Sequence, residues 1–174
     1  MKIEMCESLF YSWLRHVKGC QLVQTNWKPS PVWTVENRER VEELMRETDI
    51  YFRHKRKYDI FKGCSLSVMI SQTKSTLVGM TFDNEHTKVY SIETAFLNDE
   101  PNCNKYDTSE IIKKWIFSAL SIVACFNTGK GEIIFESPII NNEILNDLND
   151  CAADMNKLLS KNGFDFRFRV IGRF

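Results

Sequence analysis

The chain has 174 residues, of which 43% are hydrophobic and 26% are charged, the composition of an ordinary soluble globular protein. Lys plus Arg and Asp plus Glu both number 23, so no net charge attracts a polyanion and any nucleic-acid surface has to be a local patch. No stretch reaches the roughly 18 apolar residues that a membrane span needs, and the first residues carry acids and do not form a signal peptide. We therefore expect one cytoplasmic domain that does not enter a membrane.

The first 33 residues predict a helix followed by a short strand. Apolar side chains in residues 4–18 recur three and four positions apart, as on one face of a helix, and residues 21–27 (QLVQTNW) are typical of a strand. Arg15 and Lys28 lie among tryptophans here, an arrangement that can contact phosphates and stack bases. The alternative is that the tryptophans belong to the core and the cations are solvated.

Residues 34–57 predict a second helix, with Thr34 as its N-cap. Its apolar positions are sparse, so we expect one side to be exposed. The helix ends in the most basic run of the chain, which contains Arg53, Lys55, Arg56 and Lys57. This run is expected either to contact a phosphate backbone or to be a solvated surface.

Three short β-rich segments then predict an antiparallel meander: 64–72, 76–82 and 88–96. Alternation places Ser91 and Glu93 on the same face of the third strand. Downstream, a helix, a strand, a helix and a strand are predicted over 109–126, 132–137, 142–163 and 165–172. The fold class is therefore α/β, in the α+β sense, with a central mixed sheet of about five strands that contains the meander and is flanked by helices.

Two acids stand out in the segment 76–96. Asp83 follows the middle strand of the predicted meander and Glu93 lies within the third, which would put two carboxylates near one corner of the sheet. Oxygen ligands of this kind suit a divalent cation. The alternative for Asp83 is a turn residue of the hairpin, a place that Asp favours for its own hydrogen bonds. The alternative for Glu93 is an exposed strand acid paired with a lysine.

The order helix, strand, strand, strand, helix, strand, from about residue 35 to residue 137, resembles the core of the PD-(D/E)xK, or restriction-endonuclease-like, superfamily. The stretch GMTFDNEHTKVYSIETAF is similar to the hairpin that carries the acids of that superfamily. The phrases SWLRHVKGCQLVQTNW, YSIETAF and GEIIFESP are also similar to a bacterial group of uncharacterised nuclease-like proteins. On this basis an N-terminal helix and strand, residues 1–33, precede a nuclease-like core, residues 34–174.

The resemblance implies hydrolysis of a phosphodiester with Mg²⁺ held by the acids. Glu93 matches the second acid of the motif, Asp83 is the candidate for the first, and Glu7 on the first helix is a candidate for an additional metal ligand. The resemblance also implies a homodimer, because many nucleases of this kind pair to cut both strands.

The chain departs from the motif at the lysine, whose position is occupied by Ala95. Lys113 or Lys114 in the next helix would have to replace that cation. Three interpretations therefore stand: an active Mg²⁺-dependent endonuclease, an inactive nuclease-like domain that binds nucleic acid (DNA rather than RNA) or a protein partner, and an unrelated α/β domain with a structural or protein-interaction role.

Overall fold

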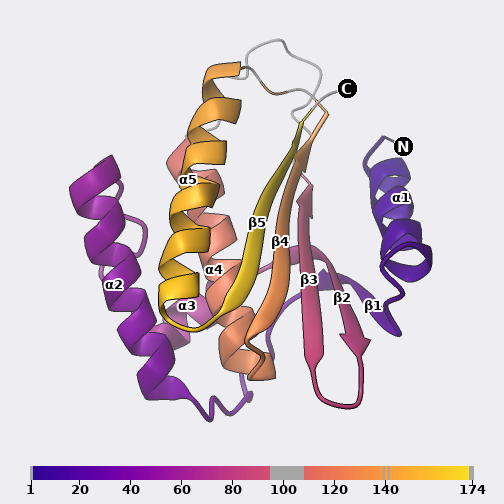
Figure 1. Ribbon diagram of the computed structural model, residues 1–174, viewed down its shortest axis with the longest axis horizontal. Helices are drawn as coiled ribbons and strands as arrows, with labels where there is room; N and C mark the ends of the chain where they lie inside the picture. Colours follow the sequence, from indigo (N-terminus) through magenta and orange to yellow (C-terminus); the bar gives the residue numbers. More distant parts are fainter. Residues whose placement is uncertain (1, 95–107, 139, 141, 173–174) are drawn as a thin grey trace.

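A mixed sheet of five strands forms the centre of the protein, which is described from a computed structural model that covers residues 2–94, 108–138, 140 and 142–172 (Figure 1). The strands lie side by side in sequence order, β1-β2-β3-β4-β5. The first two pairings are antiparallel, and β3, β4 and β5 run parallel to one another. The bounds of the strands are β1 Leu22–Trp27, β2 Ser75–Phe82, β3 Thr87–Thr94, β4 Lys130–Ser137 and β5 Asp165–Gly172. The predicted α/β class and mixed five-stranded sheet are confirmed.

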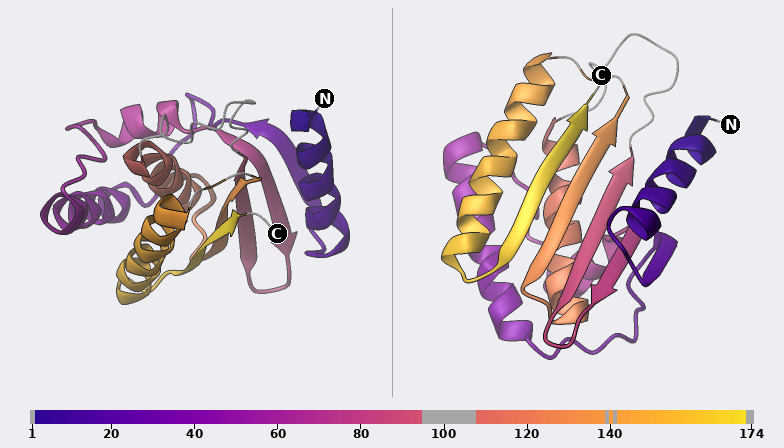
Figure 2. Two further views of the ribbon diagram at one scale, coloured as in Figure 1. Left: turned by 90° about the horizontal axis from the view of Figure 1, so that it is seen from above. Right: turned by 45° about the vertical axis from the view of Figure 1, so that its right-hand side comes forward.

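Helices cover the two faces of this sheet unequally (Figure 2). Helix α1 lies alone on one face, and the other four helices lie on the opposite face. Helices α4 and α5 are the crossovers that parallel strands need, from β3 to β4 and from β4 to β5. None of the helices in the described part of the chain is long and apolar enough to cross a membrane. The bounds of the helices are α1 Lys2–His16, α2 Arg38–Arg56, α3 Leu66–Gln72, α4 Thr108–Phe126 and α5 Asn142–Lys161.

The larger of two hydrophobic cores lies between the sheet and helices α2 to α5. Trp115 of α4 is 1% exposed and packs edge-on against Phe135 of β4 and Phe168 of β5. Full burial of one large apolar side chain contributes about 1.5–3 kcal/mol, so this layer supplies most of the stability. The smaller core lies under α1, where Phe10 and Leu14 contact side chains of β2, β3 and β4.

The prediction of a strand over residues 64–72 was wrong, because Leu66–Gln72 forms helix α3. The Ser65 side chain accepts a hydrogen bond from the backbone N–H of Val68 and so caps the helix. The buried side chains of α3 lie three and four positions apart, at Leu66, Met69 and Ile70. A short apolar run does not distinguish a buried helix from a strand.

The antiparallel meander therefore consists of β1, β2 and β3, and its first strand comes from the N-terminal segment. From residue 36 onward the order is helix, helix, strand, strand, helix, strand, followed by another helix and strand. The expected order helix, strand, strand, strand, helix, strand is thus not found. The expected cap at Thr34 was also wrong, because α2 begins at Arg38 with Asn37 as its N-cap.

Gly131 provides a test of the packing between β3, β4 and β5. A Cβ atom at Gly131 would overlap the Phe166 ring and would lie 2.9 Å from the backbone oxygen of Val89. We expect Gly131→Ala to lower the free energy of unfolding by about 2 kcal/mol, measured by urea denaturation. Gly129→Ala is the matched control, because its Cβ would meet nothing within 4 Å. Equal midpoints for the two variants would show that the strands are not packed as described.

Candidate functional sites

Glu93 lies near the end of β3, on the sheet face that packs against α4. Ser91, two residues earlier on the same face, hydrogen-bonds to Ser118 of α4 with a distance of 2.7 Å between the hydroxyl oxygens. The prediction that Ser91 and Glu93 lie on the same face of this strand is confirmed. Glu93 is only 9% exposed, whereas its alternative interpretation was an exposed acid beside a lysine.

Buried hydroxyl groups line the same region. The hydroxyls of Ser75, Ser91 and Ser118 lie within 2.7–3.1 Å of one another and satisfy each other's hydrogen bonds. One oxygen of Glu93, Oε1, is buried and has no hydrogen-bond partner among the residues described. Burial raises the pKa of Glu93 to about 7, although Lys114, a hydrogen bond from Ser75 and Lys74 act in the opposite direction.

Asp83 lies far from Glu93, at the opposite end of the β2–β3 hairpin. Its carboxylate accepts hydrogen bonds from the backbone N–H groups of Glu85 (3.0 Å) and His86 (2.6 Å), which lower its pKa. The hairpin closes at Thr87, opposite Phe82, so Glu93 lies about 20 Å farther along β3 at the rise of an extended strand. The expectation that both acids share one corner of the sheet was wrong, and Asp83 has the turn role that was its alternative.

The other predicted site residues are also dispersed. Lys114 is exposed on α4 near Glu93, and Lys113 places its ammonium 5.2 Å from the centre of the Phe117 ring. Glu7 lies on α1, which covers the opposite face of the sheet. Within the described ranges no three His, Cys, Asp or Glu side chains gather as metal ligands would. Mg²⁺ takes an octahedron of oxygen ligands, so these residues do not fit the implied ion, and Ala95 lies outside the described residues.

The basic run at the end of α2 is largely paired with acids. Arg53 contacts Asp49 and Asp59 across 3.0 and 2.8 Å. Lys55 and Arg56 both contact Asp154 of α5, across 2.7 and 2.9 Å. Burial of Asp154 opposes its ionisation, but the hydrogen bonds from Lys55 and Arg56 outweigh burial and lower its pKa. Lys55 and Arg56 therefore connect α2 to α5. Lys57, the last residue of the basic run, lies beyond the end of the helix and is exposed.

The N-terminal cations and tryptophans are divided between solvent and core. Arg15 and Lys28 are exposed. Trp27 is only 4% exposed and packs against Phe126, so it cannot stack on a base. Trp13 is half-buried and lies under the ammonium of Lys18, 4.8 Å from the ring centre to Nζ. The core alternative is therefore correct for Trp27.

A second buried acid, Glu132 of β4, was missed by the sequence reasoning. It is 3% exposed and faces the same side of the sheet as α1. Three cations converge on its carboxylate: Arg169 of β5 at 2.8 Å, Lys18 after α1 at 3.5 Å and Lys88 of β3 at 3.9 Å. Burial opposes ionisation, but the hydrogen bond from Arg169 and the charges of the three cations outweigh it and lower the pKa of Glu132.

Tyr90 completes this group, which we call the Glu132 cluster: Glu132, Lys18, Lys88, Arg169 and Tyr90. The ammonium groups of Lys18 and Lys88 lie 5.5 and 4.9 Å from the centre of the Tyr90 ring. The cluster thus places three cations around one carboxylate. The available signal was the first of the two acids in EIIFES, because a charge within an otherwise apolar interior strand needs partners.

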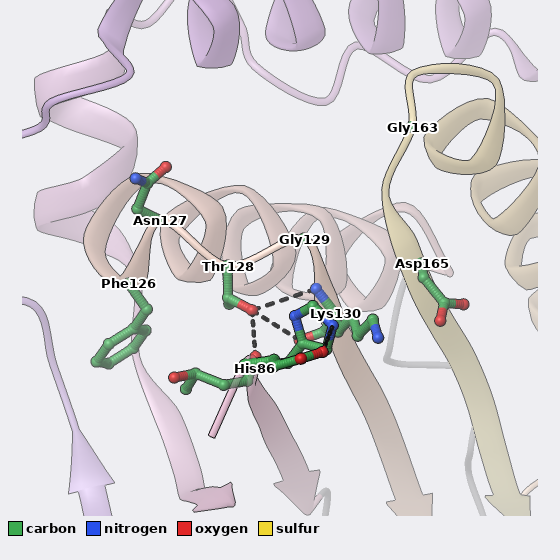
Figure 3. A pocket seen from close by; sticks show the side chains of 10 residues that line it. His86, Phe126, Asn127, Thr128, Gly129, Lys130, Gly163 and Asp165 are labelled. Carbon is green, nitrogen blue, oxygen red and sulfur yellow. Dashed lines mark hydrogen bonds and ion pairs between the residues drawn. The ribbon is translucent and has the colours of Figure 1, made fainter. Parts of the chain in front are cut away.

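A pocket of about 390 Å³ lies at the end of the sheet where the β2–β3 turn meets the turns that follow α4 and α5 (Figure 3). Thr128 holds this region together by donating a hydrogen bond to the backbone oxygen of Thr87. The lining of this pocket contains both acidic and basic side chains, so it favours neither an anionic nor a cationic ligand. Gly129 and Lys130 follow the C-terminal end of α4, the end of a helix that disfavours anions. Ten residues line the pocket: Glu85, His86, Thr87, Phe126, Asn127, Thr128, Gly129, Lys130, Gly163 and Asp165.

Comparisons of the chain with protein-family models, with curated proteins and with solved structures gave no match in any of the three.

The raised pKa of Glu93 predicts a pH dependence of stability. The folded protein holds the proton up to about pH 7, whereas the unfolded chain releases it near pH 4.5. Stability from this group is therefore full below pH 4.5 and is lost as the pH rises to about 7, by roughly 3 kcal/mol. Gln cannot ionise, so the unfolding free energy of Glu93→Gln should gain about this amount relative to the wild type between about pH 4.5 and pH 8.

Urea denaturation at a series of pH values measures this difference. Glu85→Gln, which changes an exposed carboxyl in the β2–β3 turn, is the matched control. A difference between Glu93→Gln and the wild type that stays constant with pH would contradict the burial of Glu93 as an acid that is hard to ionise.

Proposed function

We propose that the protein binds nucleic acid through the Glu132 cluster and does not require hydrolysis for its role. The observation that supports this proposal is the convergence of Lys18, Lys88 and Arg169 on a single carboxylate. One acid compensates one of the three cations. The remaining positive charge is held in place beside aromatic rings, on the surface of a chain whose total charge is zero.

The position of the cluster makes these cations accessible. Helix α1 packs mainly against β1, β2 and β3, and its apolar side chains reach Ile134 of β4, whereas β5 lies farther from the helix (Figure 2). The side chains of Lys88 and Arg169 are 41% and 37% exposed. Arg167 is exposed and lies opposite Glu132 in the β4–β5 register, so it extends the same surface. A phosphate backbone along β4 and β5 would meet these cations in succession.

Each part of the cluster has a distinct role in this proposal. Glu132 is held by its ion pairs and fixes the direction of the cations, which reduces the conformational entropy lost on binding. The Arg169 guanidinium offers a planar set of donors that fits a phosphate group, whereas the lysines act as point charges. Tyr90 is 5% exposed and orients the two lysines; it is not a platform for bases. Recognition is therefore expected to follow charge and not base sequence.

The residues predicted from the superfamily resemblance do not support a hydrolase to the same degree. Glu93 is buried beside the Ser75 hydroxyl, and Asp83 is at the other end of the hairpin. The basic run of α2 is paired with Asp49, Asp59 and Asp154, and a nucleic acid would have to displace those carboxylates. Binding without hydrolysis requires neither a second acid beside Glu93 nor the release of these ion pairs.

Two substitutions within the cluster should change affinity in opposite directions. Lys88→Gln removes a cation and should weaken binding to DNA and RNA oligonucleotides, with the slope of log Kd against log salt reduced by about one. Glu132→Gln removes the compensating charge but keeps a side-chain oxygen that can accept the hydrogen bond from Arg169, so it should strengthen binding at the same salt concentration. Fluorescence anisotropy at several salt concentrations measures both effects, and separate single-stranded, duplex and RNA probes distinguish the nucleic acids.

The paired run of α2 provides the control. Lys55→Gln removes the same charge at a position that is already engaged by Asp154, so its effect on affinity should be much smaller than that of Lys88→Gln. Thermal unfolding of each variant identifies any loss caused by misfolding. The proposal is wrong if the wild type shows no salt-dependent binding to any probe, or if Glu132→Gln weakens binding while remaining folded. Cleavage of a probe with Mg²⁺ that depends on Glu93 would instead favour the hydrolase.

A further inference from the structure

The two edges of the sheet differ in how they are protected. Strand β5 forms one edge, packs against α5 and carries the charged residues Asp165, Arg167 and Arg169. Strand β1 forms the other edge and pairs with β2 on its inner side, while no described strand lies on its outer side (Figure 1). An exposed edge offers unpaired backbone groups to another chain, and proteins commonly block such edges with charges or proline.

Strand β1 has neither form of protection, and its one irregularity lies at Asn26, near the end of the strand, where φ is 49° and the pairing with β2 skips a residue. Its sequence LVQTNW contains no charged residue and no proline. The side chains of Leu22, Gln24, Thr25 and Asn26 are exposed, although they belong to a strand. An uncharged edge meets no repulsion from a copy of itself, and the whole chain has a net charge of zero, so the approach of two copies is not opposed at longer range.

The surface next to this edge also has the character of an interface. A groove of about 300 Å³ is lined by Glu7, Ser8 and Tyr11 of α1 and by Thr25 of β1. Nearby on α1, Met5 and Leu9 are 68% and 65% exposed. Leu22 at the start of β1 is 43% exposed on the other face of the sheet, since it pairs with Met80 of the larger core. A strand added beside β1 would lie along this groove and bring apolar side chains close to these.

We propose that β1 is the interface of a homodimer in which it pairs antiparallel with β1 of a second copy. A twofold axis perpendicular to the sheet places both α1 helices on the same face of one continuous sheet. Side chains that lie opposite each other on the two β1 strands must point to the same face of the sheet. The axis therefore lies where one residue is paired with its own copy, and not between two successive residues of the strand. Gln24 lies within the regular part of the strand, which ends before Asn26, a residue with a φ of 49° that is skipped in the pairing with β2. An axis at Gln24 places Gln24 opposite its own copy and Val23 opposite Thr25.

The second copy is the occupant that this geometry favours. An antiparallel pairing of identical strands is self-complementary and closed, so it stops at two chains and does not continue into a fibre. The Glu132 cluster lies around β3, β4 and β5, away from the β1 edge, so it stays accessible in the dimer. This inference is therefore independent of the proposed nucleic-acid binding.

Charge substitution at Gln24 tests the interface. Sedimentation velocity of the full chain from about 1 µM to about 300 µM covers the affinities expected of a small interface. The wild type should form dimers in this range. Gln24→Lys and Gln24→Glu each place like charges opposite one another and should weaken the dimer roughly fivefold or more at low salt. An equimolar mixture of the two variants should restore dimers, because opposite charges then face each other.

Ser160→Lys is the matched control, since it adds the same charge at an exposed position on α5 and should leave the dimer unchanged. Circular dichroism of each variant confirms that it is folded. A wild type that remains monomeric at the highest concentration would overturn the proposal. So would a dimer that Gln24→Lys does not weaken, or a mixture of the two variants that stays as weakly associated as each alone.

Discussion

The burial of helix α4 is the constraint on which the rest of the structure depends. Parallel pairing of β3 with β4 requires a crossover, and α4 provides it between the sheet and helices α2, α3 and α5. From Ile111 to Cys125 nearly every side chain is buried, and Trp115 joins the helix to β4 and β5. From Trp115 to Cys125 every side chain of the helix is buried, so this part has no solvated face. Its polar residues, such as Ser118 and Ser121, must find partners inside the protein.

Glu93 and Glu132 show how the charges that reach a buried acid set its pKa. Glu93 faces the thick side, where serine hydroxyls are its neighbours and the nearby Lys114 is exposed on the surface, so desolvation dominates and raises its pKa to about 7. Glu132 faces the side that α1 covers only in part. Long cationic side chains reach it there from solvent, and its pKa is lowered. Glu136, four residues after Glu132 on the same face of β4, has a buried oxygen with no hydrogen-bond partner among the described residues, and burial raises its pKa. The cations that reach each carboxylate, and not the face of the sheet alone, therefore decide whether a buried glutamate is held as an anion.

Charge pairing also decides which cations are available to a ligand. The basic run at the end of α2 contains the densest positive charge in the sequence, yet Asp154 alone engages both Lys55 and Arg56. The cations around Glu132 lie far apart in the chain: Lys88 and Arg169 meet it through the pairings of β3, β4 and β5, and Lys18 reaches it from the segment after α1. Local charge density in a sequence therefore does not indicate the surface that attracts a polyanion, because net charge depends on what each cation contacts.

The sequence by itself determined the class of the fold and most of its elements, because a period near 3.6 or near 2 in apolar residues is a local property. The helix 109–126, the strand 132–137 and the alternation that places Ser91 and Glu93 on one face were predicted from such periods. The tertiary structure alone decided the rest. Residues 64–72 became a helix because Ser65 caps it and its apolar side chains fit the core. The separation of Asp83 from Glu93 and the gathering of Lys18, Lys88 and Arg169 on Glu132 follow from strand register, which pairs residues far apart in the chain and leaves no periodic signal in the sequence.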